Sequence, residues 1–281
     1  MAIQFIIDSA SDILPAQAKE LGVIHLPLKV LFGEDEFLDA VNLSHQEFYE
    51  KLSRSTDFPT TSQIPPFEFA QAYQKVTNAG DTAVVITLSG KLSGTYQSAI
   101  IAAADFEGKI FVVDSENVSI GERILLLRGL ELRSQGLSAC EIAARLDEEK
   151  HQIRVFGLLD TLQYLKKGGR ISSAAAFAGT LLSIKPVIAI TDGEVSLAGK
   201  ARGSKQGLTM LCSLIEKEHF DFQKPYYTAY NGSSEKTLQK FLTESASIWQ
   251  EETDTMPTAT IGSTIGTHAG PGAVAIAFFE K

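Results

Sequence analysis

The sequence has few cysteines and few basic side chains relative to acidic ones. Only Cys140 and Cys212 occur in 281 residues, which excludes a disulfide framework and a cysteine-rich zinc site. The 25 Lys and Arg residues are outnumbered by 34 Asp and Glu residues, and the formal net charge is -9. Nucleic-acid-binding surfaces need clustered basic residues to neutralise phosphates. We therefore expect no nucleic-acid partner.

Several catalytic and metal-binding motifs are also missing. The residues around Lys91 are not in the order of a nucleotide-binding P-loop, and residues 90–94 miss the Gly-x-Ser-x-Gly elbow of α/β-hydrolases by one position. No dinucleotide-binding glycine pattern follows the first apolar run. The five histidines are scattered, without the paired spacing of zinc ligands. We expect neither a cofactor nor a metal site.

One uncharged stretch, residues 261–279, is long enough to span a bilayer. It contains four glycines and Pro271, with His268 in its middle, a composition that favours a loop leading into a strand. The first eight residues lack the basic start of a signal peptide and are typical of a strand. We therefore expect a cytoplasmic protein with no integral membrane segment.

Apolar runs alternate with helical patterns in the first half of the chain. Capping boxes at Ser44 and Ser138 predict the starts of two helices, and a third is predicted over 65–79. Continuous apolar runs, as opposed to alternating ones, are typical of a parallel sheet covered on both faces. The sequence therefore predicts an N-terminal α/β domain over residues 1–160, with a mostly parallel sheet flanked by helices. Its predicted strands are residues 3–8, 82–88, 109–114 and 153–159.

The second half has a different order of elements. It begins with a short helix ending at Lys167 and a helical stretch over 172–182, followed by a hairpin whose turn is Thr-Asp-Gly-Glu. This order predicts a C-terminal α+β domain over residues 161–281 with a mixed or antiparallel sheet. The hairpin strands are predicted at 185–190 and 194–201, later helices at 204–218 and 233–246, and later strands at 225–230, 258–262 and 273–279.

Three loops, residues 59–66, 87–96 and 262–272, collect serine, threonine and glycine. The second runs from the end of a strand into a helix, which is where open parallel sheets bind ligands. Helix-starting N–H groups and small hydroxyls at such a place suit an anion. The alternative is that the hydroxyls only cap helices, but a cap needs one hydroxyl and this loop has several.

Other candidate residues each have a functional and a structural interpretation. His268 could bind an anionic head group, act as a base, or be structural. Arg170 could end a basic helix, or hold a carboxylate, a phosphate or a partner protein at the domain boundary. Asp8 and Asp12 could bind a metal or act as acid and base, although turn and capping roles are favoured. The apolar run 174–184 could line a tunnel, although a place in the ordinary core is favoured.

Six short motifs follow one another along the chain. Each is weak alone, but their combination and order resemble the DegV family, the bacterial fatty-acid-binding proteins that include the binding subunit of fatty acid kinase. The resemblance covers residues 3–280 as one unit. The motifs are Asp-Ser-Ala-Ser-Asp at 8–12, Thr-Ser-Gln at 61–63, Leu-Ser-Gly-Thr-Tyr at 92–96, Tyr-Leu-Lys-Lys-Gly-Gly-Arg-Ile at 164–171, Ile-Lys-Pro-Val at 184–187 and His-Ala-Gly-Pro-Gly at 268–272.

The resemblance implies a carrier, without catalysis of its own, that holds one long-chain fatty acid in a tunnel between the two domains. It also implies a partner, the fatty acid kinase catalytic subunit, which would convert the bound acid to an acyl-phosphate for phospholipid synthesis. Arg170 would face that partner or the head group. Ile64 stands where the family usually has proline. The ligand-binding residues implied are Thr61, Ser62, Ser93, Gly94, Thr95, Thr267 and His268.

An apolar lining can supply the affinity of such a carrier. A chain of roughly 16 carbons at about 0.8 kcal/mol per methylene is worth on the order of 12 kcal/mol before ordering costs. Two other classes remain open. An acyl hydrolase or transferase would use Ser93 as nucleophile and His268 as base, and a nucleotide- or phosphate-binding module would use the glycine and hydroxyl loops.

Overall fold

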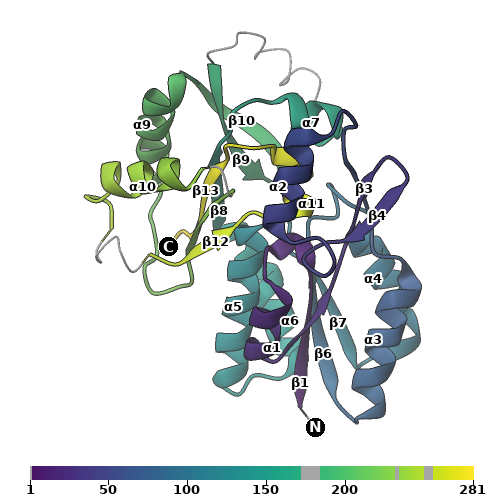
Figure 1. The fold of residues 1–281 in the computed structure, drawn as a ribbon. Coiled ribbons are helices and arrows are strands. Elements are labelled where there is room, and N and C mark those ends of the chain that lie inside the picture. The colour runs from purple at the N-terminus through teal and green to yellow at the C-terminus, as the bar shows by residue number, and fades with distance from the viewer. Residues whose placement is uncertain (1, 172–183, 232–233, 250–255) are drawn as a thin grey trace.

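The computed structural model describes residues 2–171, 184–231, 234–249 and 256–281 (Figure 1). These residues form two large β-sheets and one small one. The strand orders are β2-β1-β6-β7 in the first sheet, β10-β9-β8-β13-β11-β12 in the second and β4-β3-β5 in the third. The first sheet occupies the lower part of Figure 1, the second the upper part, and the small sheet lies beside them.

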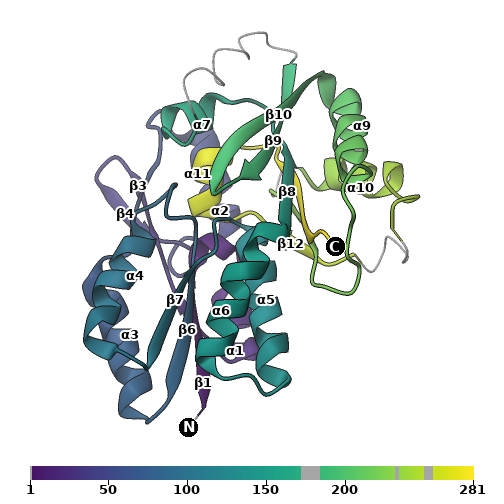
Figure 2. The ribbon, with the colours of Figure 1, turned by 180° about the vertical axis from the view of Figure 1, so that it is seen from behind.

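The first sheet is parallel throughout and is covered by helices on both faces. Val84 and Ile86 pack against residues of α5 and α6, whereas Ala83 and Val85 pack against residues of α3 and α4. Figure 2 shows α5 and α6 together on the near side of this sheet. The prediction of a covered parallel sheet is confirmed. Its elements are β1 (Ile3–Asp8), β2 (Val23–Leu26), β6 (Thr82–Thr87) and β7 (Ile110–Asp114), with α1 (Pro15–Leu21), α3 (Pro66–Asn78), α4 (Thr95–Ala103), α5 (Ile120–Ser134) and α6 (Ala139–Glu149).

Both predicted capping boxes are present, at the starts of α2 (His45–Arg54) and α6. The Ser44 backbone N–H donates to the Glu47 carboxylate at 2.9 Å, and the Ser138 N–H donates to the Glu141 carboxylate at 2.8 Å. Each serine hydroxyl also accepts the backbone N–H of its glutamate. The reciprocal pairing satisfies N–H groups that the helix itself leaves unpaired.

The small sheet consists of β3 (Lys29–Phe32), β4 (Asp35–Leu38) and β5 (Thr60–Ser62). The sequence analysis predicted no strand between residues 23 and 38, where β2, β3 and β4 are each only four residues long. Strand β5 is part of the first predicted loop, and its Thr61 is in register with Val30. A strand position therefore fixes the direction of the Thr61 side chain.

The second sheet is mixed, as predicted, but it includes one strand that the sequence analysis grouped with the parallel strands. Strand β8 pairs antiparallel with β9 and β13, so that grouping is wrong. Ile153 and Val155 face one core cluster, and Phe156 and Leu158 face another. A continuous apolar run indicates a strand that is buried on both faces, but it does not indicate which sheet the strand joins. The strands are β8 (Ile153–Leu158), β9 (Ile184–Thr191), β10 (Glu194–Arg202), β11 (Tyr227–Tyr230), β12 (Thr258–Thr260) and β13 (Val274–Phe279).

The predicted hairpin is confirmed as β9 and β10, which turn at Asp192 and Gly193. The predicted helical stretch 172–182 lies outside the described residues, and so does the apolar run 174–184 apart from Ile184, which begins β9. The helices described in this half are α7 (Gln163–Lys167), α9 (Gly203–Ile215), α10 (Glu235–Glu244) and α11 (Ser263–Ala269). Short 3-10 turns occur earlier in the chain, at η1 (Ser9–Ser11), η2 (Ala104–Phe106) and η3 (Lys150–Gln152).

Helix α11 corrects the prediction of a loop over residues 262–272. Gly262 and Gly270 flank the helix and do not interrupt it. The backbone N–H groups of Ser263 and Thr264 donate to the carboxylate of Asp39, 224 and 225 residues earlier in the chain. This helix start is stabilised by a distant residue, so no local capping signal is visible. None of the helices in the described part of the chain is long and apolar enough to cross a membrane.

Candidate ligand-binding site

Helix α11 is fixed at its N-terminus by two buried carboxylates from the first half of the chain. Asp12 accepts the backbone N–H of Gly262 at 2.7 Å. Asp39, which is fully buried, accepts the N–H groups of Ser263 at 3.1 Å and Thr264 at 3.3 Å. Carboxylates at a helix start accept hydrogen bonds from N–H groups that the helix leaves unpaired, and they interact favourably with the partial positive charge of the helix N-terminus. The helix is therefore held firmly at the junction of the two halves.

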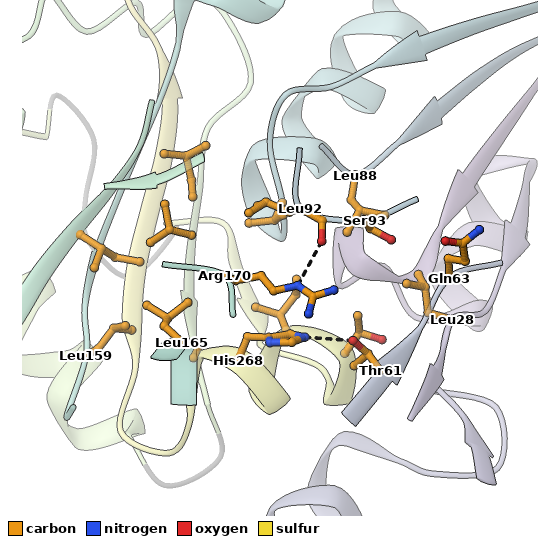
Figure 3. A pocket seen from close by; sticks show the side chains of 17 residues that line it. Leu28, Thr61, Gln63, Leu88, Leu92, Ser93, Leu159, Leu165, Arg170 and His268 are labelled. Atoms are coloured by element: carbon orange, nitrogen blue, oxygen red, sulfur yellow. Dashed lines mark hydrogen bonds between the residues drawn. The ribbon is translucent and has the colours of Figure 1, made fainter. Parts of the chain in front are cut away.

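A mainly aliphatic pocket lies along α11 (Figure 3). It encloses about 670 Å³ of empty space, counting the solvent at its opening. Leu88 and Leu92 line it from the loop after β6, and Ile188 and Ile190 line it from β9. Both halves of the chain thus contribute walls. The polar residues that line it are Thr61, Gln63, Ser93, Arg170, Thr264 and His268.

His268 and Thr61 join α11 to β5 across this pocket. His268 Nε2 and Thr61 Oγ1 are 2.9 Å apart and share a hydrogen bond (Figure 3). Burial, and secondarily the positive charge of Arg170, lowers the pKa of His268 to about 4. The imidazole is therefore neutral at physiological pH, with one donor and one acceptor nitrogen. It can bind an anion by hydrogen bonding but not by ion pairing.

Arg170 ties the second half of the chain to the loop after β6. Its Nε donates to the Leu92 carbonyl at 3.1 Å, and one terminal nitrogen donates to the Gly168 carbonyl at 2.5 Å. Gly168 also allows His268 to approach the end of α7, because a Cβ at this position would collide with Nδ1 of the imidazole. The predicted boundary arginine thus lies at the pocket, with its positive charge beside the histidine.

Ser93 lines the pocket just before α4. Its hydroxyl is 2.9 Å from the hydroxyl of Thr95, whose backbone N–H also donates to Ser93 at 3.3 Å. Thr95 is fully buried and does not line the pocket. Gly94 does not line it either, and it lies against the side chain of Gln63, where a Cβ would collide. Thr95 therefore orients Ser93, and Gly94 leaves room for Gln63.

Two further residues from the sequence analysis do not line the pocket. Ser62 is exposed, because neighbouring residues of β5 point to opposite sides. Thr267 is buried, and its hydroxyl donates to the Ser263 carbonyl at 2.8 Å. Thr264 was missed, although it lies four residues before His268. Thr264 and His268 share a face only if the segment is helical, and the sequence analysis predicted a loop there.

The turn and capping role favoured for Asp8 is confirmed. Its carboxylate accepts the backbone N–H of Ala10 at 2.9 Å, which caps η1, and that of Leu88 at 2.8 Å. Asp12 ends the same turn with a left-handed backbone. Within the described ranges, no three or more His, Cys, Asp or Glu side chains are grouped so that they could hold a metal ion.

Fold and pocket together define a class of α/β protein with two main sheets. An aliphatic pocket lies where the two halves of the chain meet, and its polar side chains lie in one region of it. The DegV family model matches residues 2–281, and this chain belongs to that family. The resemblance inferred from the six motifs is thereby confirmed. A DegV domain-containing protein of Deinococcus radiodurans is 34% identical over 99% of this chain and 98% of its own length. Protein DegV of Bacillus subtilis is 29% identical over the full length of both chains.

Solved structures of the family have the same fold and are described as fatty-acid-binding. A DegV family protein from Thermus thermophilus, described for its fatty acid binding, has a TM-score of 0.86 with 32% identity over both whole chains. DegV from Bacillus subtilis, described as a fatty acid binding protein, has a TM-score of 0.83 with 28% identity over both whole chains. A stearic acid-binding protein from Eubacterium ventriosum has a TM-score of 0.85 with 25% identity, covering 100% of this chain and 99% of its own.

Proposed function

We propose that this protein binds one long-chain fatty acid in the pocket along α11, with the carboxylate held by Thr61, Ser93 and His268. The observation that carries the proposal is the aliphatic pocket whose polar side chains gather in one region. Figure 3 shows Thr61, His268 and Arg170 close together, with Leu159 and Leu165 to their left. The fatty acid binding described for related DegV proteins supports the same ligand class.

The chemistry of the polar region suits a carboxylate that must stay accessible. The bond between Thr61 and the neutral imidazole uses one of that pair's two hydrogens, so the pair has one hydrogen left to donate, and the Ser93 hydroxyl can supply another. The Arg170 guanidinium adds positive charge, while its Nε and one terminal nitrogen donate to the Leu92 and Gly168 carbonyls. The protein would act as a cytoplasmic carrier without catalysis of its own. It would present the acid to a fatty acid kinase catalytic subunit, which forms an acyl-phosphate for phospholipid synthesis, and Arg170 would contact that partner or the head group.

Mass spectrometry on gently purified protein, native and then after solvent extraction, tests the ligand. We expect one C14–C18 fatty acid per chain. An empty protein that also gains no thermal stability from added fatty acids would contradict the proposal. The kinase partnership needs a separate assay, in which loaded protein, a kinase subunit and ATP yield acyl-phosphate. Unchanged phosphorylation after substitution of Thr61, Ser93 or His268 would contradict the proposed presentation of the carboxylate.

The acyl hydrolase alternative has less support from the geometry. Ser93 Oγ pairs with Thr95 and His268 Nε2 pairs with Thr61, and no hydrogen bond joins Ser93 to His268 in the described part of the chain. A serine nucleophile needs a base within hydrogen-bond reach. Turnover of acyl esters that disappears in Ser93→Ala would favour the hydrolase over the carrier.

A further inference from the structure

Helix α11 carries a second polar side chain on the face that lines the pocket. Thr264 precedes His268 by four residues, so the two lie on one helix face about 5–6 Å apart at their Cβ atoms. Thr264 is only 2% exposed, and its hydroxyl has no hydrogen-bond partner among the residues that the structure describes. Buried hydroxyls are nearly always hydrogen-bonded, because leaving one unpaired is unfavourable.

Thr267 on the same helix shows how a threonine is normally satisfied. Its hydroxyl donates to the carbonyl of Ser263, four residues earlier, and it faces away from the pocket. Thr264 is the second residue of α11, so the carbonyl four residues before it belongs to β12 and not to the helix. Its backbone N–H is held by Asp39. Thr264 is thus fixed by its backbone while its hydroxyl at the pocket stays unpaired.

Building on the fatty acid function proposed above, we propose that Thr264 is a further ligand-binding residue whose hydroxyl donates a hydrogen bond to the carboxylate, beside Thr61 and His268. A carboxylate has about four acceptor sites, more than these two groups and Ser93 can fill. A hydroxyl bonded to a carboxylate also forms a stronger bond than one between neutral groups. The bound acid would supply the partner that this hydroxyl lacks.

The substitution Thr264→Val keeps the shape of the side chain and removes the hydroxyl. We expect unliganded Thr264→Val to be at least as stable as wild type in urea, because an unpaired buried group is lost. We expect its Kd for palmitic acid to rise about tenfold or more, and its Kd for methyl palmitate, which has no charge, to rise less. Thr264→Ser, which restores the hydroxyl, should regain most of the affinity for the acid.

Thr267→Val is the matched comparison, since it removes a paired hydroxyl from the same helix. It should lower stability and change the affinity for palmitic acid less than Thr264→Val does. Wild-type affinity of Thr264→Val for palmitic acid, or equal losses for acid and ester, would overturn the assignment of Thr264 while leaving the fatty acid function intact. If wild-type protein itself binds neither ligand, the proposed function fails and the role of Thr264 fails with it.

Discussion

Two sets of polar groups around α11 differ in how fully they are hydrogen-bonded. Three carboxylates, the junction carboxylates, lie at the N-terminus of this helix or in the turn over residues 8–12, and every one of their oxygens accepts at least one hydrogen bond. Along its pocket face lies the head-group cluster, in which the Thr264 hydroxyl and His268 Nδ1 have no partner in the described chain. The junction carboxylates are Asp8, Asp12 and Asp39, and the head-group cluster is Thr61, Ser93, Thr264 and His268.

This difference separates groups that hold the fold from groups that await a ligand. A saturated buried network contributes rigidity, and removing one member leaves others unpaired. A buried group that the protein itself leaves unpaired is unfavourable in the empty state and gains a partner on binding. We therefore expect substitutions at the junction carboxylates to change stability first, and substitutions in the head-group cluster to change binding first.

The largest effect is expected for Asp39→Ala. The Asp39 carboxylate accepts the hydroxyl and N–H of Ser263, the N–H of Thr264 and the hydroxyl of Ser9. Its removal leaves several buried donors unpaired, so the free energy of unfolding should fall by about 3 kcal/mol or more, measured by urea denaturation. Asp39→Asn keeps the shape and should lose less. Wild-type stability in both variants would show that α11 is not anchored there.

The second prediction concerns pH and the junction. Burial raises the pKa values of Asp8 and Asp12 to about 7, against the hydrogen bonds that lower them. Burial, followed by the charges of Asp8, Asp12 and Asp114, raises the pKa of Glu122 well above its usual value, and neither of its oxygens has a partner in the described chain. The folded state then keeps protons that the unfolded chain loses, so these groups make stability fall as pH rises.

Three partly buried histidines act in the opposite direction below about pH 6.5. Burial lowers the pKa values of His25, His45 and His268, so the unfolded chain binds their protons first and stability falls as pH falls. The acids and the histidines change the free energy of unfolding in opposite directions between about pH 4.5 and 6.5. Above that window the acids outweigh the remaining titration of the histidines, so the free energy of unfolding measured by urea denaturation should fall between pH 6.5 and 8. Glu122→Gln should make this fall shallower, and an unchanged slope would contradict the role of Glu122.

Local patterns and distant contacts explain which features the sequence predicted. The capping box at Ser44 and the continuous apolar run of β6 depend on neighbouring residues, and both elements formed as predicted. Strand β8 was assigned to the wrong sheet because burial on both faces does not identify the partner strand. Helix α11 was missed because its N-terminus is stabilised by Asp39, which no local pattern connects to Ser263.

The candidate site shows the same division. Thr61, Ser93, Arg170 and His268 come from motifs that the resemblance singled out, and all four line one pocket. The residues next to Thr61 and His268 do not line the pocket, because strand alternation turns Ser62 away and helix geometry turns Thr267 away. Motifs thus predicted the segments of the site, whereas the direction of each side chain required the strand β5 and the helix α11.

The third prediction tests the bond within the head-group cluster. Thr61→Val and His268→Ala each remove one side of the 2.9 Å hydrogen bond and a contact to the carboxylate. Each should raise the Kd for a long-chain fatty acid by about tenfold, with a smaller change in stability than Asp39→Ala. The double variant should lose less than the sum, measured by calorimetric titration, because the two residues share one bond. Additive losses would show that they act independently.

The smallest effects are expected at two adjacent glycines after α7, which separate binding from stability. Gly168 has a helical backbone that alanine adopts readily, with φ near -75, but a Cβ there would collide with His268 Nδ1. In Gly168→Ala the imidazole must move away, which weakens its bond to Thr61. We expect a Kd for fatty acid that is a few-fold higher and a free energy of unfolding within about 1 kcal/mol of wild type.

Gly169→Ala is the matched control for Gly168→Ala, because it should lower stability without moving His268. Gly169 has φ +69, where alanine is strained, and a Cβ there would have no neighbour within 4 Å. Strain alone should lower the free energy of unfolding by about 1 kcal/mol and leave His268 and the fatty acid affinity unchanged. If both variants lose stability and affinity together, the segment after α7 acts as one unit. If only Gly168→Ala loses affinity, the position of the His268 imidazole, and not the stability of the segment, determines head-group binding.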